Sequence, residues 1–112
     1  MPPMPDGSEA ALQSEVIRLA KMHGWLVFRP TPHQVNQVWR TDGRGFPDLT
    51  LGHPHRGLLF LELKSDTGRL TEAQRDWGDI LERYGEYYVI RWAQLQMLVD
   101  RLAQRGDNEP PR

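Results

Sequence analysis

The sequence contains no cysteine. Disulfides, thiolate zinc sites and cysteine nucleophiles are therefore excluded as sources of its stability or chemistry. It also lacks an apolar run long enough to span a membrane, and no signal peptide is visible. We therefore expect a cytoplasmic protein with no membrane partner. There is no internal repeat, and a length of 112 residues predicts one domain.

The chain also has little net charge. Its formal charge is −1, which disfavours nucleic-acid binding driven by charge alone. The charge is uneven, because residues 1–75 carry nine Lys/Arg against eight Asp/Glu, whereas residues 76–112 carry five Arg against seven Asp/Glu. A local basic strip in the first part of the chain is compatible with this balance, and a bound metal would neutralise acidic side chains.

Caps, apolar periodicity and turn residues predict the order helix, three strands, helix, strand, helix. The expected elements are a helix at 8–23, strands at 25–29, 48–51 and 58–64, a helix at 71–84, a strand at 86–91 and a helix at 93–104. We expect a disordered tail at 1–7, a single domain at 8–104 and a flexible tail at 105–112. Residues 30–44 are expected to form a long loop.

Each expected helix carries an apolar stripe that should face the core. The residues expected to be buried are Leu12, Val16, Leu19 and Ala20 in the first helix, Trp77, Ile80 and Leu81 in the second, and Leu95, Leu98, Val99 and Leu102 in the third.

Two charged residues end the apolar strand at 58–64. Side chains alternate along a strand, so Glu62 and Lys64 share one face while the leucines at 59, 61 and 63 face the core. A turn around Gly52–Gly57 would make a hairpin that brings Asp48 beside Glu62. Two adjacent carboxylates repel each other unless a cation lies between them, and oxygen ligands favour Mg²⁺ or Mn²⁺. The Lys64 ammonium could then contact a phosphate.

Asp48 followed by Glu62-Leu63-Lys64 resembles the PD-(D/E)xK signature of the restriction-endonuclease-like nucleases, with Pro47 as the P. A longer string resembles the VRR-NUC (virus-type replication-repair nuclease) family in its small standalone phage and bacterial form. The residues of that string are Gly45-Phe46-Pro47-Asp48-Leu49, Glu62-Leu63-Lys64, Gly68-Arg69-Leu70-Thr71 and Gln74. The resemblance covers about residues 8–100 and implies an α/β fold, with an αβββαβ core, a mixed central sheet flanked by helices and an extra C-terminal helix.

The resemblance also implies a function. It implies a metal-dependent, structure-selective DNA endonuclease that hydrolyses phosphodiester bonds and is similar to Holliday-junction resolvases. The expected cofactor is Mg²⁺ or Mn²⁺, and the expected partners are branched or duplex DNA and a second copy of the chain. The expected location is the cytoplasm of a bacterial cell or a phage-infected host.

The roles of individual residues follow from the same resemblance. Asp48, Glu62 and the Leu63 backbone carbonyl are expected to bind the metal, and Lys64 to orient water or stabilise negative charge. A Glu near the start of the first helix matches Glu9, which is expected to add a catalytic and metal-site carboxylate, with Glu15 as the substitute. Thr71 and Gln74 match a family position beside the active site. They also suit a capping box at the helix start.

Several polar residues are candidates for contacts with DNA phosphates. Arg44, Arg69 and Arg75 flank the motif and are the principal candidates, whereas each could also be an ordinary exposed residue. The expected loop adds weaker candidates, and two apolar residues in it could belong to a dimer contact. These residues are Arg29, His33, Gln34 and Arg40 for phosphate, and Val38 and Trp39 for the dimer.

His53 and His55 could suggest a metal site, but they lie in a Pro/Gly turn without a nearby third ligand, so a plain hairpin loop is favoured. Two rival functions remain. One is a flap, nicking or restriction-type nuclease of the same fold. The other is a catalytically inactive DNA-binding module, which the low net charge favours and the intact motif disfavours.

Overall fold

A computed structural model describes residues 8–30, 33–35, 38–40 and 43–111, with the backbone alone for 33–35 and 38–40. The elements are α1 (Glu9–Met22), β1 (Leu26–Phe28), β2 (His33–Val35), β3 (Val38–Arg40), β4 (Leu49–His53), β5 (Gly57–Leu63), α2 (Glu72–Tyr84), β6 (Glu86–Ile90), the 3₁₀ turn η1 (Trp92–Gln94) and α3 (Leu95–Ala103). The tail expected at 1–7 lies outside the described residues.

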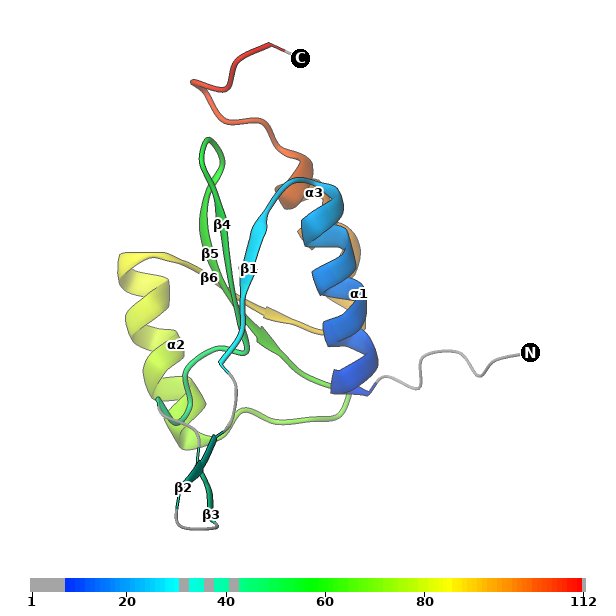
Figure 1. Ribbon diagram of the computed structural model, residues 1–112. Helices are drawn as coiled ribbons and strands as arrows, with labels where there is room; N and C mark the ends of the chain where they lie inside the picture. The colour runs from blue at the N-terminus through cyan, green and yellow to red at the C-terminus, as the bar shows by residue number, and fades with distance from the viewer. Residues whose placement is uncertain (1–7, 31–32, 36–37, 41–42, 112) are drawn as a thin grey trace, which may run out of the picture.

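The main sheet has four strands in the order β1-β4-β5-β6. β1, β4 and β5 pair antiparallel, whereas β6 pairs parallel with β5 after the crossover through α2. Figure 1 shows α1 and α3 on one side of this sheet and α2 on the other. The expected α/β architecture is therefore confirmed, with an αβββαβ core compatible with a restriction-endonuclease-like fold and α3 as the additional C-terminal helix.

The first helix forms as its sequence predicts. The Ser8 hydroxyl accepts a hydrogen bond from the Ala11 N–H at 3.2 Å and so caps the helix. Gly24 follows the helix with a φ of 84°, a left-handed conformation that suits glycine. The four residues expected to face the core, Leu12, Val16, Leu19 and Ala20, are all buried.

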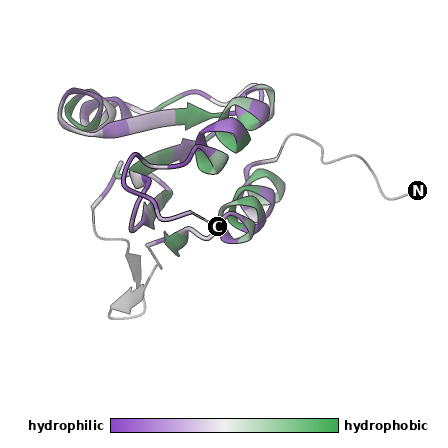
Figure 2. Cartoon of the chain, turned by 90° about the horizontal axis from the view of Figure 1, so that it is seen from above, coloured by the Kyte–Doolittle hydropathy of each residue, from purple (hydrophilic) through white to green (hydrophobic). Residues whose placement is uncertain are grey.

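The core lies between the sheet and the pair α1 and α3. Leu59, Leu61 and Leu63 are buried as their alternation predicts, and Leu98 and Leu102 of α3 pack into the same cluster. The hydropathy colouring of Figure 2 shows the hydrophobic residues concentrated in the sheet and on one stripe of the helices that cover it. Within the described residues, no helix is long and apolar enough to cross a membrane.

Two expectations about strands and loops were wrong. Residues 30–44 are not a plain loop, because they contain the two-stranded sheet of β2 and β3. The side chains of the candidate residues in these strands lie outside what the structure describes. The central hairpin is also longer than expected, with β4 reaching His53 and β5 starting at Gly57, because Gly52 continues the pairing opposite Leu58.

The second helix buries less than its stripe predicts. Ile80 was expected to be buried and is 52% exposed, while Trp77 and Leu81 are only partly buried. Gly78 is the buried residue of α2, and a Cβ there would lie 2.8 Å from the Tyr87 hydroxyl. Since each helical residue turns about 100°, a helix seated on Gly78 directs Ile80 away from the sheet.

Candidate active site

The hairpin of β4 and β5 places the two motif carboxylates together. Leu49 pairs with Leu61 across the hairpin, so Asp48 comes next to Glu62 just beyond that pair. The Asp48 Oδ2 atom accepts a hydrogen bond from the Leu63 N–H at 2.8 Å. Because the N–H and C=O of one strand residue point to the same side, the Leu63 carbonyl also faces Asp48.

Glu62 is a buried carboxyl group that is only partly satisfied. Its residue is 1% exposed, and its Oε1 atom accepts a hydrogen bond from the Gln74 amide at 3.1 Å. Its Oε2 atom is buried and has no hydrogen-bond partner among the described residues. Burial first, and then the adjacent Asp48 carboxyl group, raise the pKa of Glu62 to about 9. Without a cation, the raised pKa therefore favours the protonated form of Glu62 at neutral pH.

The start of α2 brings Gln74 to Glu62. The Thr71 hydroxyl accepts from the Gln74 N–H at 3.2 Å, and Gln74 Oε1 accepts from the Thr71 N–H at 2.9 Å, which completes the expected capping box. The amide nitrogen of the same Gln74 side chain remains free to bind Glu62. Capping and contact with the site therefore coexist in one side chain, and the N-terminus of α2 faces the site, where it favours anions.

Glu9 lies at the site and Glu15 does not. The Glu9 Oε1 atom is 3.8 Å from the Lys64 Nζ atom. Lys64 itself is only 8% exposed. Glu15 instead pairs with Arg18 on the exposed side of α1, at 2.5 Å. This difference follows from position, since Glu9 is in the first turn of α1 and that turn meets the end of β5.

The acidic pair has the chemistry of a divalent-cation site. Asp48, Glu62 and the Leu63 carbonyl offer oxygen atoms on one side of the hairpin, and the Oε2 atom of Glu62 has no hydrogen-bond donor among the described residues. Within the described residues, no group of three or more His, Asp or Glu side chains lies close enough to hold a metal. Two carboxylates and one carbonyl suit a Mg²⁺ or Mn²⁺ ion, whose remaining ligands would come from water and substrate, as Mg²⁺ prefers.

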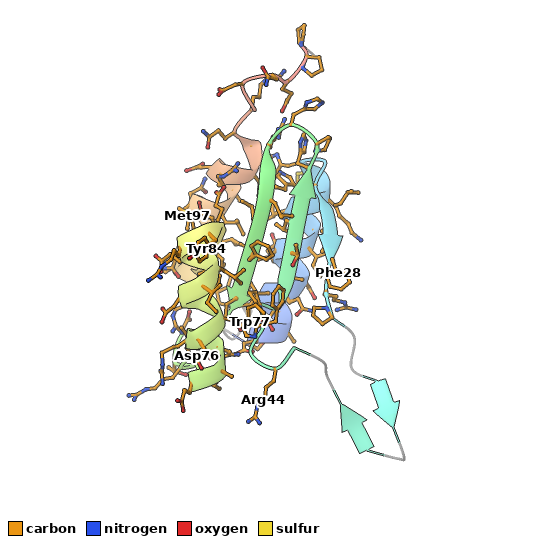
Figure 3. The ribbon with its side chains drawn as sticks, turned by 90° about the vertical axis from the view of Figure 1, so that its left-hand side faces the viewer. Phe28, Arg44, Asp76, Trp77, Tyr84 and Met97 are labelled. Carbon is orange, nitrogen blue, oxygen red and sulfur yellow. The ribbon has the colours of Figure 1, made fainter. Side chains whose placement is uncertain are left out.

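The three arginine candidates are exposed around this end of the molecule. Arg44 and Arg69 are exposed, and Figure 3 shows Arg44 directed away from the ribbon below Trp77. The Arg75 Nη1 atom donates to the Leu70 carbonyl at 3.0 Å, so Arg75 also holds the loop before α2. His53 and His55 lie at the far end of the hairpin, in line with the hairpin-loop interpretation.

Two glycines shape the site in a way that sequence reasoning did not assign. A Cβ on Gly68 would lie 2.8 Å from the Ser65 hydroxyl and 3.6 Å from Glu9 Oε1, so this loop passes directly beside the Lys64–Glu9 pair. A Cβ on Gly45 would lie 2.5 Å from the carbonyl carbon and oxygen of Ala73. Both glycines belong to the string of residues that resembles the VRR-NUC family. That string is the sequence signal that pointed to them.

Comparison with family descriptions agrees with this geometry. The VRR-NUC domain matches residues 8–94, which include the acidic pair, Lys64, Glu9 and Gln74. Comparison with curated proteins and with solved structures finds no match. A match over most of the chain shows the family, and it implies a nuclease that acts on DNA. The chain therefore belongs to the VRR-NUC family of nucleases.

Proposed function

We propose that this protein is a Mg²⁺- or Mn²⁺-dependent DNA endonuclease that selects branched DNA, in the manner of a Holliday-junction resolvase. The observation that carries the metal-dependent reaction is the Asp48–Glu62 pair. Glu62 is buried, one of its oxygens has no hydrogen-bond partner in the described part of the chain, and its pKa is raised to about 9. A fold gains nothing in stability from such a pair, because burying it is costly.

A divalent cation held by Asp48, Glu62 and the Leu63 carbonyl would supply Lewis acidity to water and to the scissile phosphate. The chain's own residues do the rest. The Lys64 ammonium stabilises the negative charge that develops on the phosphate as water adds to phosphorus and the bond to the leaving oxygen breaks. The Gln74 amide holds Glu62 in place through Oε1. Glu9 orients Lys64 from the outer edge of the site, at 3.8 Å.

DNA would approach along the N-terminus of α2. Arg44, Arg69 and Arg75 are exposed around that helix start, and the helix dipole adds a positive field there. We assign these arginines to phosphate contacts. This local basic edge explains how a chain with a formal charge of −1 can bind DNA.

We further propose a homodimer, so that two sites face two strands of a junction. An apolar patch supports it. Leu26, Phe28 and Leu58 are 76%, 62% and 54% exposed, and the register places all three on one face of β1, β4 and β5. Figure 3 shows Phe28 on the part of this face that α2 leaves uncovered. The patch contains no cation and therefore does not suit DNA.

Glu9 and Glu15 give a matched pair of variants for the outer part of the site. Glu9→Gln is expected to lower the cleavage rate about 10–100-fold, because Lys64 loses the acid that orients it. Glu15→Gln breaks only an exposed pair with Arg18 and should leave the rate unchanged. Single-turnover cleavage of both variants in Mn²⁺ measures the difference. Equal cleavage rates for the two variants would show that Glu9 has no role in the reaction.

The whole proposal is tested by cleavage of a labelled four-way junction beside a linear duplex, in Mg²⁺, Mn²⁺ and EDTA. We expect symmetric cuts in the junction, no cuts in EDTA and at least about a 100-fold loss in Lys64→Ala. Light scattering on the same sample should give the mass of a dimer. Cleavage of every substrate would support the nuclease activity but would exclude a preference for the junction.

The rival functions predict other results. A flap or nicking nuclease would cut flapped or nicked duplexes faster than the junction. An inactive binding module would retain DNA binding and cut nothing in any metal. In that case, the buried Asp48–Glu62 pair would need another explanation.

A further inference from the structure

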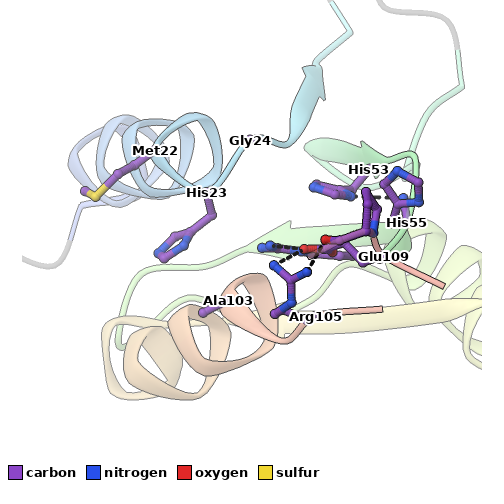
Figure 4. A pocket seen from close by; sticks show the side chains of 10 residues that line it. Met22, His23, Gly24, His53, His55, Ala103, Arg105 and Glu109 are labelled. Atoms are coloured by element: carbon purple, nitrogen blue, oxygen red, sulfur yellow. Dashed lines mark hydrogen bonds and ion pairs between the residues drawn. The ribbon is translucent and has the colours of Figure 1, made fainter. Parts of the chain in front are cut away.

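A second charged site lies at the opposite end of the hairpin from the nuclease site. A hollow of about 600 Å³ opens between the end of α1, the β4–β5 turn and the segment after α3. Figure 4 shows His23, His53, His55 and Arg105 around it, with Glu109 in the middle. From Gly57 to Leu63 the strand spans roughly 20 Å, so this hollow is separate from the carboxylate pair.

The donors in this hollow converge on one carboxylate. The Arg56 Nε and Nη2 atoms donate to Glu109 Oε1 and Oε2 at 2.7 and 2.9 Å. The Arg105 Nη1 atom lies 2.7 Å from Glu109 Oε2, and the Gly106 N–H donates to Oε1 at 3.3 Å. The hydrogen bonds from Arg56 are the main cause that lowers the pKa of Glu109 to about 2. A planar guanidinium fork binds carboxylate and phosphate alike.

Further contacts hold Arg56 and the segment around Gly106 in place. The Arg56 side chain is 9% exposed, and its Nη1 atom donates to the Leu102 carbonyl at 2.9 Å. A Cβ on Gly106 would lie 1.7 Å from the His55 carbonyl oxygen, so the backbone of this segment lies directly on the β4–β5 turn. The positions of the Arg56 guanidinium and the Gly106 N–H are therefore both fixed by contacts within the fold.

His53 supplies a further donor to the hollow. Its Nδ1 atom accepts from the His55 N–H at 3.0 Å, so the neutral ring carries its proton on Nε2. Among the described residues, that N–H has no acceptor. Burial first, and then the positive charge of Arg56, lower the pKa of His53, so its ring is neutral at neutral pH.

We propose that Arg56, Arg105, the Gly106 N–H and His53 form a phosphate-binding site, in which Glu109 of the same chain is a replaceable stand-in for the ligand. The ligand is a phosphate group, either free or in a nucleic-acid backbone. Glu109 is three residues from Gly106 and competes at an effective concentration in the millimolar range or above. Phosphate should therefore bind the wild-type protein weakly and bind much more tightly once the carboxylate is removed.

The test is a titration with inorganic phosphate at constant ionic strength. Trp25 is the reporter, since its indole N–H donates to the same Leu102 carbonyl that Arg56 contacts, and its NMR signal should shift. In Glu109→Gln, we expect the phosphate concentration for half-saturation to fall at least tenfold. Glu15→Gln, the same change in an exposed pair, should match the wild type. Arg105→Gln added to Glu109→Gln should reverse the gain.

The competing explanation is that Glu109 only neutralises a buried arginine. A folded Glu109→Gln protein that melts at lower temperature and binds phosphate no better than chloride would establish that explanation and overturn the proposal. If Glu109→Gln does not fold, the wild type is titrated against Arg105→Gln, whose side chain is 35% exposed in the native protein. Unchanged phosphate affinity in that variant would also overturn it.

The source of the phosphate is decided with a short DNA duplex in an Asp48→Asn background, where cleavage is blocked. Displacement of bound inorganic phosphate by the duplex would assign the site to the nucleic-acid backbone. Phosphate binding that the duplex does not disturb would assign it to a free phosphate. Because neither measurement uses cleavage, failure of the proposed nuclease function would leave this result standing.

Discussion

Glu62→Gln is expected to make the metal-free protein more stable while it abolishes cleavage. In EDTA at pH 8, we expect the free energy of unfolding to rise by about 1–3 kcal/mol. Cleavage in Mg²⁺ or Mn²⁺ should fall at least about 1,000-fold, because the amide is a poor ligand for the metal and leaves the pair one charge short. Few substitutions raise stability and remove activity together, and this combination is typical of a strained functional site.

The pH dependence gives the sign of the stability effect. The pKa of Glu62 is raised from an ordinary 4.5 to about 9 in the folded chain, by burial first and by Asp48 next. Its contribution to stability is therefore fully present below pH 4.5 and is lost as the pH rises through 9, because only the unfolded chain ionises freely in that window. Urea denaturation in EDTA should show this decline in the wild type and a flatter profile in Glu62→Gln.

Two comparisons make the result specific. Glu15→Gln changes a carboxyl group of ordinary exposure and should keep the wild-type pH profile. Added Mn²⁺ should stabilise the wild type at pH 8 and leave Glu62→Gln unaffected. Parallel pH profiles for wild type and Glu62→Gln would contradict the assignment of a protonated, metal-seeking carboxyl pair.

Gly45→Ala is expected to cause the largest loss of stability among simple substitutions near the site. Gly45 has a φ of 84°, and its added Cβ would lie 2.5 Å from the backbone carbonyl of Ala73. Backbone strain and the clash together should cost about 2–5 kcal/mol. The clash would displace the start of α2 and with it Gln74, so cleavage should also fall.

Gly43→Ala is the matched control. Gly43 also has a positive φ, 70°, but among the described residues its added Cβ would meet only the Phe46 Cβ at 3.6 Å, an ordinary contact. It should therefore lose only the strain, about 1–2 kcal/mol, and keep its activity. Urea denaturation followed by tryptophan fluorescence measures both losses, since Trp77 packs against Phe46 with ring centroids 4.9 Å apart. Equal losses in the two variants would show that the close approach to Ala73 is unimportant.

Much of this protein followed from local patterns in its sequence. The Ser8 cap and the Leu12–Ala20 stripe predicted α1, because a helix with one apolar face has a single way to bury it. The alternation from Leu59 to Lys64 assigned the buried and polar faces of β5, because the side-chain period of a strand is two residues. The Thr71–Gln74 spacing predicted the capping box for the same local reason.

Other features depended on packing between distant segments. The stripe of α2 suggested that Ile80 is buried, but the contact of Gly78 with Tyr87 decided how the helix is rotated. The length of the hairpin followed from the pairing of Gly52 with Leu58, which the glycine signal had suggested was a turn. The second sheet of β2 and β3 has no strong alternation, and the prolines at 30 and 32 with the polar residues that follow favoured a loop.

The sequence by itself predicted the residues of the candidate site, because Asp48, Glu62 and Lys64 combine the motif spacing with an apolar strand. The tertiary structure decided which other groups join them. Glu9 rather than Glu15 reaches Lys64, because the first turn of α1 meets the end of β5. Glu109 reaches Arg56 across 53 residues, because the chain after α3 folds over the β4–β5 turn. Local patterns carry no information on such contacts, since these are set by how helices and strands pack in three dimensions.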